Sequence, residues 1–473
     1  MKWAIAVSFA LFCISLAASA STVTFATFLG GSDIDTTIAV ATDLDGNTIV
    51  VGDTVSISIL GLSRPTTAFS DTYVVKLNRN GVVVFRKFLG GSGSEIARAV
   101  TTDSSGNIYV AGVTSSFDFP LKNPFRSTLN TGGDLYLVKM TGSGEVIYST
   151  FFGGTGVEQV GGVAADASGN AYVTGYTNSA DLPLVREAQR FPPGSSAAAF
   201  LFKINSNGSA LGYSTYLGGA LQDLTTGVKV DRQGNAYVAG TTRSLNFPTT
   251  ANAFQRNRRG DADAFVTKYD SSGAVVFSTL IGGQEQDAVT ALDVKDGGIY
   301  VAGVTSSSDF PTRLPLIATR GAAPLSALAA KFTTEGTLVF STYLNSGGSA
   351  QTQAVGIGVN GQGEAAVLLG ATANDLPTKN AVQPSLAGQS DAYIVQLNTA
   401  GSERVFATYF GGGAIDVPTA MSVDAAGRIT FCGNTSGTLL TKNAALAFYQ
   451  GGLGDGFVTR IQLEKTKSRV VRH

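Results

Sequence analysis

Histidine is almost absent from this chain of 473 residues, because the only copy is His473, the last residue. Serine–histidine–aspartate triads and the common zinc sites depend on histidine, so the sequence excludes both classes of site. Cysteine and tryptophan are almost as scarce, with two copies and one copy. Trp3 and Cys13 both lie within residues 1–20, so a chain without that segment has no tryptophan and keeps only Cys432. No disulfide can then form within the chain.

Charge is also sparse. Charged residues make up 14% of the chain, against about 25% in an average protein, and the net charge is −1. A chain without a basic excess gives no reason to expect a nucleic-acid partner. The 58 glycines and the low charge instead indicate much buried sheet and many turns.

The N-terminal segment, residues 1–20, resembles a secretory signal. Lys2 is followed by an apolar run to about Ala17, and the segment ends in the small residues Ala18-Ser19-Ala20 that signal peptidase accepts. The run is shorter than the roughly 18 residues that span a bilayer, and no second such run follows. We therefore expect residues 1–20 to be a cleaved signal peptide and the chain to be exported by the Sec route, as a secreted, periplasmic or cell-surface protein without a transmembrane segment.

One sequence motif, the repeated phrase, occurs seven times in full or altered form. It consists of Asp, two variable residues, Gly-Asn, then Tyr-Val, a small residue and Gly. Its first glycine recurs at nearly constant spacing along the chain, as Gly46, Gly106, Gly169, Gly234, Gly297, Gly363 and Gly427. A spacing this regular indicates copied supersecondary units. We therefore predict one closed array over residues 21–463, in place of the two or three domains that the length suggests.

Each unit predicts four antiparallel strands. In the fourth unit the expected strands are residues 226–230, 236–240, 264–268 and 275–279, which we name a to d in chain order. They are rich in β-branched and aromatic residues and are bounded by Gly, Asn, Asp and Ser. Asp231 to Asn235 predicts a short turn whose glycine adopts positive φ. Such units have apolar residues on both faces, which they can bury by stacking around an axis.

The ends of the chain predict how the ring closes. The seventh unit has strands a, b and c but no strand d, whereas residues 22–31 at the other end match the strand d phrase of residues 211–219. The sequence thus predicts an all-β, single seven-bladed propeller of four-stranded antiparallel blades, closed by the N-terminal strand. Residues 464–473 read as a basic, disordered tail.

The repeated phrases resemble a known family. Tyr-Leu-Gly-Gly, residues 103–112 and Ser-Ser-Ser-Asp-Phe-Pro at 306–311 are similar to the bacterial seven-bladed β-propeller repeats called SBBP repeats, over nearly the whole chain after the signal. The resemblance implies an exported bacterial propeller and supplies no catalytic residues. Unit 6, at residues 361–364, and unit 7, at residues 436–439, depart most from the pattern.

Both short turns of each unit are expected on one face of the disc, and the long loops between strands b and c on the other. Loops of about 20 residues exceed hairpin length, and loops on a rigid scaffold often carry function.

Six units have a carboxylate four residues after Gly-Gly, at the start of strand a. In a closed ring these six carboxylates could surround the channel mouth; they are Asp35, Glu95, Glu158, Asp223, Asp287 and Asp416. Two interpretations stay open: a ring that binds a cation such as Ca²⁺, or acceptors of local backbone N–H bonds. No other cofactor is indicated.

Basic residues also recur in the long loops. They are Lys122, Arg126, Arg186, Arg190, Arg256, Arg258, Arg259, Arg313 and Arg320. They could form a positive rim for an anionic polymer, or be solvated and locally paired. Arg256, Arg258 and Arg259 are the densest group and the least repeat-like, so they are the candidate ligand-binding residues.

We interpret two further motifs as structural. The segments 118–120, 181–183, 246–248, 309–311 and 375–377 place Asp or Asn two residues before Pro, which suits a loop fixed by side-chain bonds to backbone. Asp43 to Asn47 begins like a Ca²⁺ loop, but no Glu follows at the twelfth position, so we expect a turn. Cys432 occupies the place of Ala239 in another copy and is expected in the core.

The leading hypothesis is an exported, non-catalytic monomer that binds a protein or polysaccharide of the cell envelope or exterior through the long-loop face. Two alternatives remain: a carboxylate-dependent or Ca²⁺-dependent polysaccharide hydrolase or lyase at the channel mouth, and a purely structural envelope component. An active site needs unlike residues in unlike roles, whereas the acidic ring is nearly symmetric.

Overall fold

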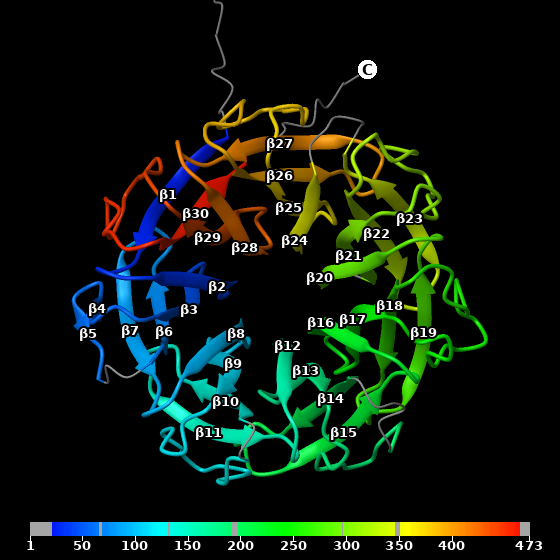
Figure 1. The fold of residues 1–473 in the computed structure, drawn as a ribbon, viewed down its shortest axis with the longest axis horizontal. Helices are drawn as coiled ribbons and strands as arrows, with labels where there is room; N and C mark the ends of the chain where they lie inside the picture. Colours follow the sequence, from blue (N-terminus) through cyan, green and yellow to red (C-terminus); the bar gives the residue numbers. More distant parts are fainter. Residues whose placement is uncertain are drawn as a thin grey trace, which may run out of the picture.

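The computed structural model describes residues 21–65, 69–130, 133–190, 197–295, 297–345 and 351–463. The predicted signal peptide and C-terminal tail lie outside these ranges. Seven four-stranded antiparallel sheets stand around a central axis, as Figure 1 shows. The sequence-based prediction of a seven-bladed propeller is confirmed.

Each blade contributes one strand to each of four concentric positions. The innermost strands are β2 (Asp35–Thr42), β8 (Glu95–Thr102), β12 (Glu158–Ala165), β16 (Asp223–Val230), β20 (Asp287–Lys295), β24 (Thr352–Val359) and β28 (Asp416–Val423). The second strands are β3 (Thr48–Thr54), β9 (Ile108–Thr114), β13 (Ala171–Thr177), β17 (Ala236–Thr242), β21 (Gly298–Thr305), β25 (Ala365–Ala371) and β29 (Ile429–Thr435).

The third strands are β6 (Asp71–Leu77), β10 (Asp134–Met140), β14 (Ala198–Ile204), β18 (Asp263–Tyr269), β22 (Ser326–Thr333), β26 (Asp391–Leu397) and β30 (Asp455–Gln462). The outer strands are β7 (Val83–Leu89), β11 (Val146–Phe152), β15 (Leu211–Leu217), β19 (Val275–Ile281), β23 (Leu338–Tyr343), β27 (Arg404–Phe410) and β1 (Thr22–Leu29). A short hairpin, β4 (Ser58–Ile59) with β5 (Leu62–Ser63), stands outside blade 1. The strands of the fourth unit extend slightly beyond the predicted limits.

The core lies between the blades. Each of the seven junctions holds one cluster of buried apolar side chains drawn from two neighbouring sheets. Between blades 2 and 3, for example, Phe152 stacks on Phe202 with ring centroids 3.9 Å apart. A single blade would expose these side chains, so stacking in a closed ring is what buries them.

The N-terminal strand completes the last blade, as predicted. β1 pairs antiparallel with β30, and Figure 1 shows these two strands side by side in one sheet. Phe25, Phe28 and Leu29 of β1 are at most 1% exposed. Backbone hydrogen bonds thereby join the beginning of the described chain to its end.

The glycines of the repeated phrase all have positive φ, between 77° and 80°. Residues with a Cβ rarely adopt this conformation, which explains why glycine recurs there. The Asp of the same phrase accepts bonds from the turn: Asp43 Oδ1 from Asn47 N at 2.8 Å, and Asp43 Oδ2 from Asn47 Nδ2 at 2.9 Å. The interpretation of residues 43–47 as a turn is confirmed.

Cys432 is fully buried, and burial raises the pKa of its thiol to about 11. The prediction of a core thiol is confirmed. Within the described ranges no helix has the length and apolar character that crossing a membrane would require.

Candidate functional site

The long-loop face is organised by the Asp or Asn of the recurring Pro segments. In blade 2, Asp118 Oδ1 accepts bonds from Ser92 N at 2.8 Å and Ser92 Oγ at 2.9 Å, which ties the long loop to the connection that enters the innermost strand. Asp181, Asn246 and Asp309 repeat the backbone bond in blades 3, 4 and 5. The predicted role as loop anchors is therefore confirmed for these four residues, and the beginning of each loop has a fixed position.

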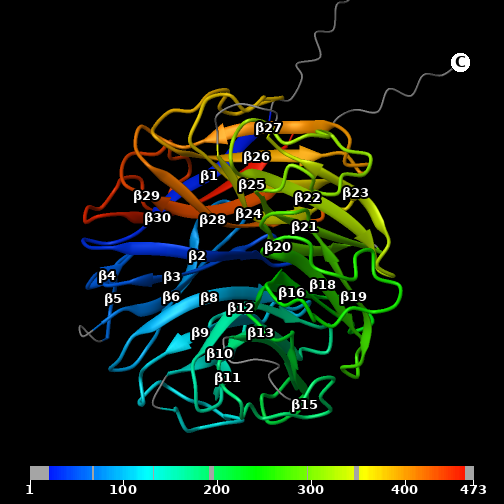
Figure 2. The same cartoon turned by 45° about the vertical axis from the view of Figure 1, so that its right-hand side comes forward.

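The long loops do not stay on that face. In five blades they run over the outer wall of the disc and form an isolated antiparallel bridge with the outer strand, as between Lys122 and Ser149; the other bridges are Val185 with Ser214, Arg313 with Ser341, Lys379 with Ala407 and Lys442 with Ala26. In blade 4, Thr250 N bonds Ser278 O at 3.0 Å. Figures 1 and 2 show these loops around the outside of the ring. The loops thus occupy the free edges of six outer strands.

The six predicted carboxylates begin the innermost strands, as expected, but they do not surround one open site. Each is at most 1% exposed. Five accept a bond from the backbone N–H of the second glycine of Gly-Gly, with Asp287 and Gly283 N 2.7 Å apart; the other pairs are Asp35 with Gly31, Glu95 with Gly91, Asp223 with Gly219 and Asp416 with Gly412. Threonine and serine hydroxyls bind the same carboxylates. The local-acceptor interpretation explains these contacts.

A cation site made of this ring stays a prediction of the sequence. Across the described residues, no three His, Cys, Asp or Glu side chains are grouped so that they could hold one metal ion. Each of the six lies at its own blade junction instead.

A second set of buried carboxylates was missed from the sequence. They are the first residues of five third strands: Asp71, Asp134, Asp263, Asp391 and Asp455. Each faces the carboxylate that begins the innermost strand of the next blade, so five junctions hold an acid pair: Asp71 with Glu95, Asp134 with Glu158, Asp263 with Asp287, Asp391 with Asp416 and Asp455 with Asp35. Asp at a constant position before an apolar strand was the available signal.

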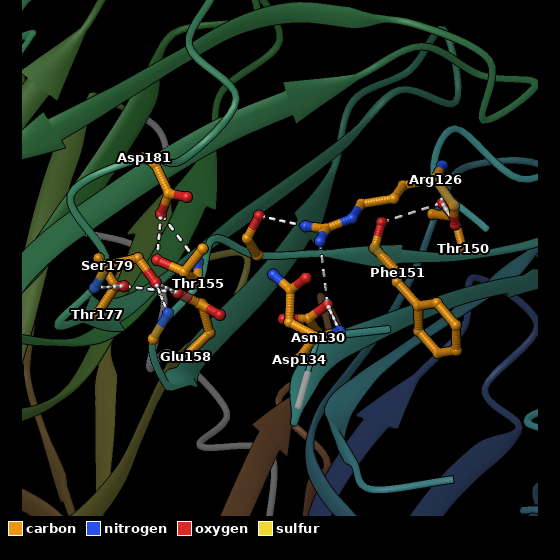
Figure 3. A network of polar contacts seen from close by, with 12 residues as sticks. Arg126, Asn130, Asp134, Thr150, Phe151, Thr155, Glu158, Thr177, Ser179 and Asp181 are labelled. Atoms are coloured by element: carbon orange, nitrogen blue, oxygen red, sulfur yellow. Dashed lines mark hydrogen bonds and ion pairs between the residues drawn. The ribbon is translucent and has the colours of Figure 1, made fainter. Parts of the chain in front are cut away.

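The junction of blades 2 and 3 shows the arrangement in detail (Figure 3). Glu158 Oε1 accepts bonds from Thr177 Oγ1 at 2.6 Å and Ser179 Oγ at 2.5 Å. Asp134 Oδ2 accepts a bond from Asn130 N at 3.1 Å and lies 3.7 Å from the guanidinium of Arg126. One oxygen of each carboxylate faces the other carboxylate across Gly153 and has no other partner.

This geometry favours the protonated form of Asp134. The pKa of Asp134 is raised to about 6: burial and the neighbouring Glu158 raise it, while the Asn130 N–H and Arg126 lower it. In the same way burial raises the pKa of Asp455 to about 6. Both aspartates therefore keep their protons to higher pH than an exposed aspartate does.

Stability should consequently fall as the pH rises from 5 to 8. Carboxyls with raised pKa bind more protons folded than unfolded, so they stabilise the fold below pH 4 and lose that contribution as the pH passes the folded pKa. Asp53, with its pKa raised to about 7 by burial, acts in the same direction. Asp43 and Asp166, whose pKa values are lowered, change protonation below pH 4 and do not oppose the trend in this window. We expect the free energy of unfolding in urea to be about 3 kcal/mol lower at pH 8 than at pH 5.

Asp134→Asn supplies the control, because its amide can donate to Glu158 without a proton to lose. It should flatten part of the pH dependence and unfold at higher urea than the unsubstituted chain at pH 8. Equal slopes for the two chains would contradict the raised pKa of Asp134.

Gly-Gly is required by these junctions. A Cβ on Gly153 would overlap Asp134 Oδ1 and Glu158 Oε2, and one on Gly154 would come within 2.5 Å of Ser179 Cβ. Gly153→Ala should therefore cost about 2–3 kcal/mol of unfolding free energy, measured by urea denaturation. Gly227→Ala is the matched control, since its Cβ would meet only Leu292 Cβ, at 3.6 Å. Similar losses in both variants would argue against this account of the glycine.

The structure does not gather the predicted basic rim on one surface. Lys122, Arg186 and Arg313 lie at the outer wall, next to or at the bridges with the outer strands. Arg190 pairs with Glu187 at 2.6 Å. Three other arginine side chains donate hydrogen bonds to backbone carbonyls beside the blade junctions: Arg126 to Gly153, Arg258 to Gly260 and Arg320 to Ala323. Arg256 and Arg259 are exposed, so of the three candidate binding residues Arg258 has an internal bond.

Above the acid pair of blades 2 and 3 the face is hollowed. A pocket of about 350 Å³ is lined by Arg126, Asn130, Gly153, Thr155 and Asp181, together with Phe125, Gly154 and Pro183. One wall is basic and the opposite wall acidic, as Figure 3 shows for Arg126 and Asp181. The arrangement suits a small polar group of a partner, and it leaves the buried acids out of reach of bulk solvent.

Blade 6 departs from the repeat in a coordinated way. Thr352 replaces the carboxylate, Ala371 replaces the threonine and Ala373 replaces the serine that bind it elsewhere. A recess of about 290 Å³ lies here, lined by Leu325, Gly370, Val417 and their neighbours. The carboxylate is thus absent together with the threonine and the serine that bind it in other blades. This fits the rule that a buried carboxylate needs its hydrogen bonds.

Exposed apolar side chains recur in the connections of the same face. Ile57, Phe117 and Leu245 precede or take the place of the loop anchor in blades 1, 2 and 4 and are 69%, 73% and 72% exposed. Ile34, Val157 and Ile415 directly precede the innermost strands of blades 1, 3 and 7 and are 40%, 43% and 43% exposed. The sequence analysis did not single them out, because an isolated apolar residue in a loop gives no periodic signal.

The fold and these junctions define a seven-bladed β-propeller whose blades are joined by buried polar networks. Three segments, residues 84–120, 147–183 and 212–248, match the SBBP β-propeller repeat, so the chain contains repeats of this family. Each matched segment runs from an outer strand through Gly-Gly to the proline that follows the loop anchor. The resemblance stated from the sequence is confirmed for these three segments.

Solved structures with a similar fold have unrelated sequences. A protein of unknown function from Dyadobacter fermentans is 10% identical with a TM-score of 0.39, and the match covers 94% of this chain and all of that one. The β-propeller domain of the trilobed protease from Pyrococcus furiosus is 8% identical with a TM-score of 0.44, covering 95% and 99% of the two chains. The quinohemoprotein alcohol dehydrogenase ADHIIG from Pseudomonas putida HK5 is 10% identical with a TM-score of 0.39, covering 94% and 77%. No curated protein sequence matches the chain. Likenesses this weak say nothing of function.

Proposed function

We propose that this chain is an exported, non-catalytic binding module that contacts a protein or polysaccharide of the cell envelope or exterior through its long-loop face. The observation that carries the proposal is the set of exposed apolar side chains in the connections of the long-loop face, with Phe117 and Leu245 more than 70% exposed. Exposed apolar groups that gather on one face of a rigid scaffold typically mark an interaction surface.

The fixed loop bases support this role. Because Asp118, Asp181, Asn246 and Asp309 bind the backbone of the neighbouring connection, a partner would meet a surface that is already ordered. A surface ordered before binding loses less conformational entropy on association.

The buried carboxylates support a non-catalytic role. General acid or nucleophilic chemistry on a glycan needs a carboxyl in contact with substrate, whereas the six acids of the innermost strands are at most 1% exposed and hydrogen-bonded within the blades. The hydrolase or lyase alternative would need other residues.

Export is part of the proposal and rests on residues 1–20. Mass spectrometry of the protein from its own cells should find a chain that starts at Ser21 in the exported fraction. An intact Met1 in a cytoplasmic fraction would remove export without touching the binding role.

The binding role is tested by screening the protein against a glycan array and immobilised envelope fractions. We expect saturable binding without turnover. If the ligand is an anionic glycan, replacing Arg256 and Arg259 with Ser should weaken binding while the melting temperature stays the same, since both are exposed. Release of a shortened glycan would overturn the non-catalytic proposal.

A further inference from the structure

One outer strand differs from all the others. In six blades the outer strand donates a backbone hydrogen bond to the long loop of the same blade. In blade 2, for example, Phe151 N donates to Arg126 O at 3.2 Å. The equivalent bonds are Tyr216 N to Gln189 O, Leu280 N to Gln255 O, Tyr343 N to Ile317 O, Tyr409 N to Gln383 O and, in blade 7, Phe28 N to Leu446 O. In blade 1 the equivalent N–H groups belong to Arg86 and Phe88 of β7. Neither has such an acceptor in the described part of the chain.

The reason is the short loop of blade 1. It lacks the Pro segment of the repeat and forms the hairpin of β4 and β5, and its Arg64 turns back to Asp71, 3.8 Å away. β7 is exposed as a result: of its last five residues only Leu89 is buried and Arg86 is exposed, whereas the last five residues of β11, β15, β19 and β27 are all buried. Figure 1 shows β7 at the outside of the ring, beside this hairpin.

A groove lies along the uncovered edge. Its volume is about 590 Å³, and Val83 and Arg86 of β7 line it together with residues 57, 58, 60 and 61 of the hairpin region. Ala445, Leu446 and Gln450, from the loop of blade 7, form the opposite wall. The groove therefore lies where a covering loop runs in the other blades.

The charge of this edge is positive. Arg86 and Lys87 stand where the other outer strands have Ser or Ala followed by Thr, and exposed Arg79 lies in the turn before β7. Residues 72–94 contain no Asp or Glu. Two copies of this edge would place like charges opposite each other, which disfavours pairing of the chain with itself. The basic residues 465, 467, 469 and 472 make the C-terminal segment an equally poor match.

We propose that the edge of β7 is a docking site for an extended acidic segment of a partner protein, which adds an antiparallel strand to blade 1. The covering loops of this same chain provide the geometry: an extended segment crosses the outer strand antiparallel and accepts the N–H groups equivalent to those of Arg86 and Phe88. Backbone bonds would supply affinity and the two cations would select carboxylates. Ile57 borders both surfaces, but the edge of β7 itself lies outside the long-loop face, and the proposal does not depend on the function proposed for that face.

The test uses the full chain and two labelled peptides, one alternating valine with glutamate and one alternating valine with lysine, followed by fluorescence anisotropy. The glutamate peptide should bind and the lysine peptide should not. Arg86→Pro removes an N–H that the fold leaves unbonded, and it should weaken binding of the glutamate peptide at least about tenfold relative to Arg86→Ser, which keeps the N–H. If Arg86→Pro does not fold, the double variant R86E/K87E replaces it and should reverse the preference between the peptides.

Hydrogen exchange measures the same edge directly. In the free chain the amides of Arg86 and Phe88 should exchange much faster than their equivalents Ser149 and Phe151, and the glutamate peptide should slow them at least about tenfold. The proposal is overturned by equal binding of both peptides or of neither, or by unchanged binding to Arg86→Pro. It is also overturned if the two amides are already protected in the free monomer, which would mean that a segment of this chain covers them. Protection only in a dimer would assign the edge to a second copy and would overturn it too.

Discussion

A chain that begins at Ser32, and so lacks β1, is expected to unfold at least about 10 °C below a chain that begins at Ser21, on the order-of-magnitude relation between lost burial and melting temperature. Phe25, Phe28, Leu29 and Val23 are almost fully buried, and losing four such side chains removes roughly 8 kcal/mol of apolar burial. That loss is comparable to the total stability of an ordinary domain. The edge of β30 would also lose its backbone partners along the whole strand.

Differential scanning calorimetry of the two chains measures the effect. A synthetic peptide of residues 21–31, added to the shortened chain, should restore part of the lost melting temperature by pairing with β30. An unchanged melt on deletion would mean that the ring does not depend on its closing strand, and the fold account would be wrong at that point.

Arg460→Met is expected to lower the free energy of unfolding by about 3–5 kcal/mol, because it removes a buried cation that joins the first and last blades and leaves its acceptors unpaired. Arg460 is 1% exposed and donates to Gly46 O at 2.6 Å, Thr48 Oγ1 at 2.7 Å and Thr430 Oγ1 at 2.9 Å. Burial lowers the pKa of its guanidinium to about 10, so it stays charged at neutral pH.

Arg460→Lys is the matched control, since five blades have lysine at this position. Lys139 shows what lysine can do there, with Nζ 3.0 Å from Gly169 O and 2.9 Å from Ser206 O. We expect the lysine variant to lose about 1–2 kcal/mol, less than half the loss of the methionine variant. Urea unfolding at neutral pH distinguishes them, and equal losses would show that the hydrogen bonds to blade 1 contribute little.

The sequence predicted what repeats along the chain. Strand positions, the number of blades, the closing role of residues 22–29 and the anchoring role of Asp118 and its equivalents each had a periodic signal within one unit or a match between two units. Their physical causes are local: alternating burial, positive φ at Gly46 and its equivalents, and side-chain bonds to nearby backbone.

What the sequence did not reveal depends on contact between units. The pairing of Asp134 with Glu158 joins different blades, so its meaning emerges only when the blades stand side by side. The path of the long loops over the outer strands rests on backbone bonds such as that of Phe151 with Arg126, which leave little trace in side-chain identity. The uncovered edge of β7 did have a signal, the change from Ser-Thr to Arg86-Lys87, which becomes interpretable once the covering loops are seen.

Binding through the long-loop face is tested most directly by two sets of surface substitutions measured on the same envelope fractions. Phe117→Ser and Leu245→Ser together alter only the long-loop face, whereas Leu44→Ser and Val82→Ser alter exposed apolar side chains of the short turns on the opposite face. All four positions are more than half exposed, so neither set should change the melting temperature appreciably. The account predicts that the first set abolishes saturable binding and the second leaves it intact. Binding that survives the first set and is lost with the second would place the functional surface on the other side of the propeller.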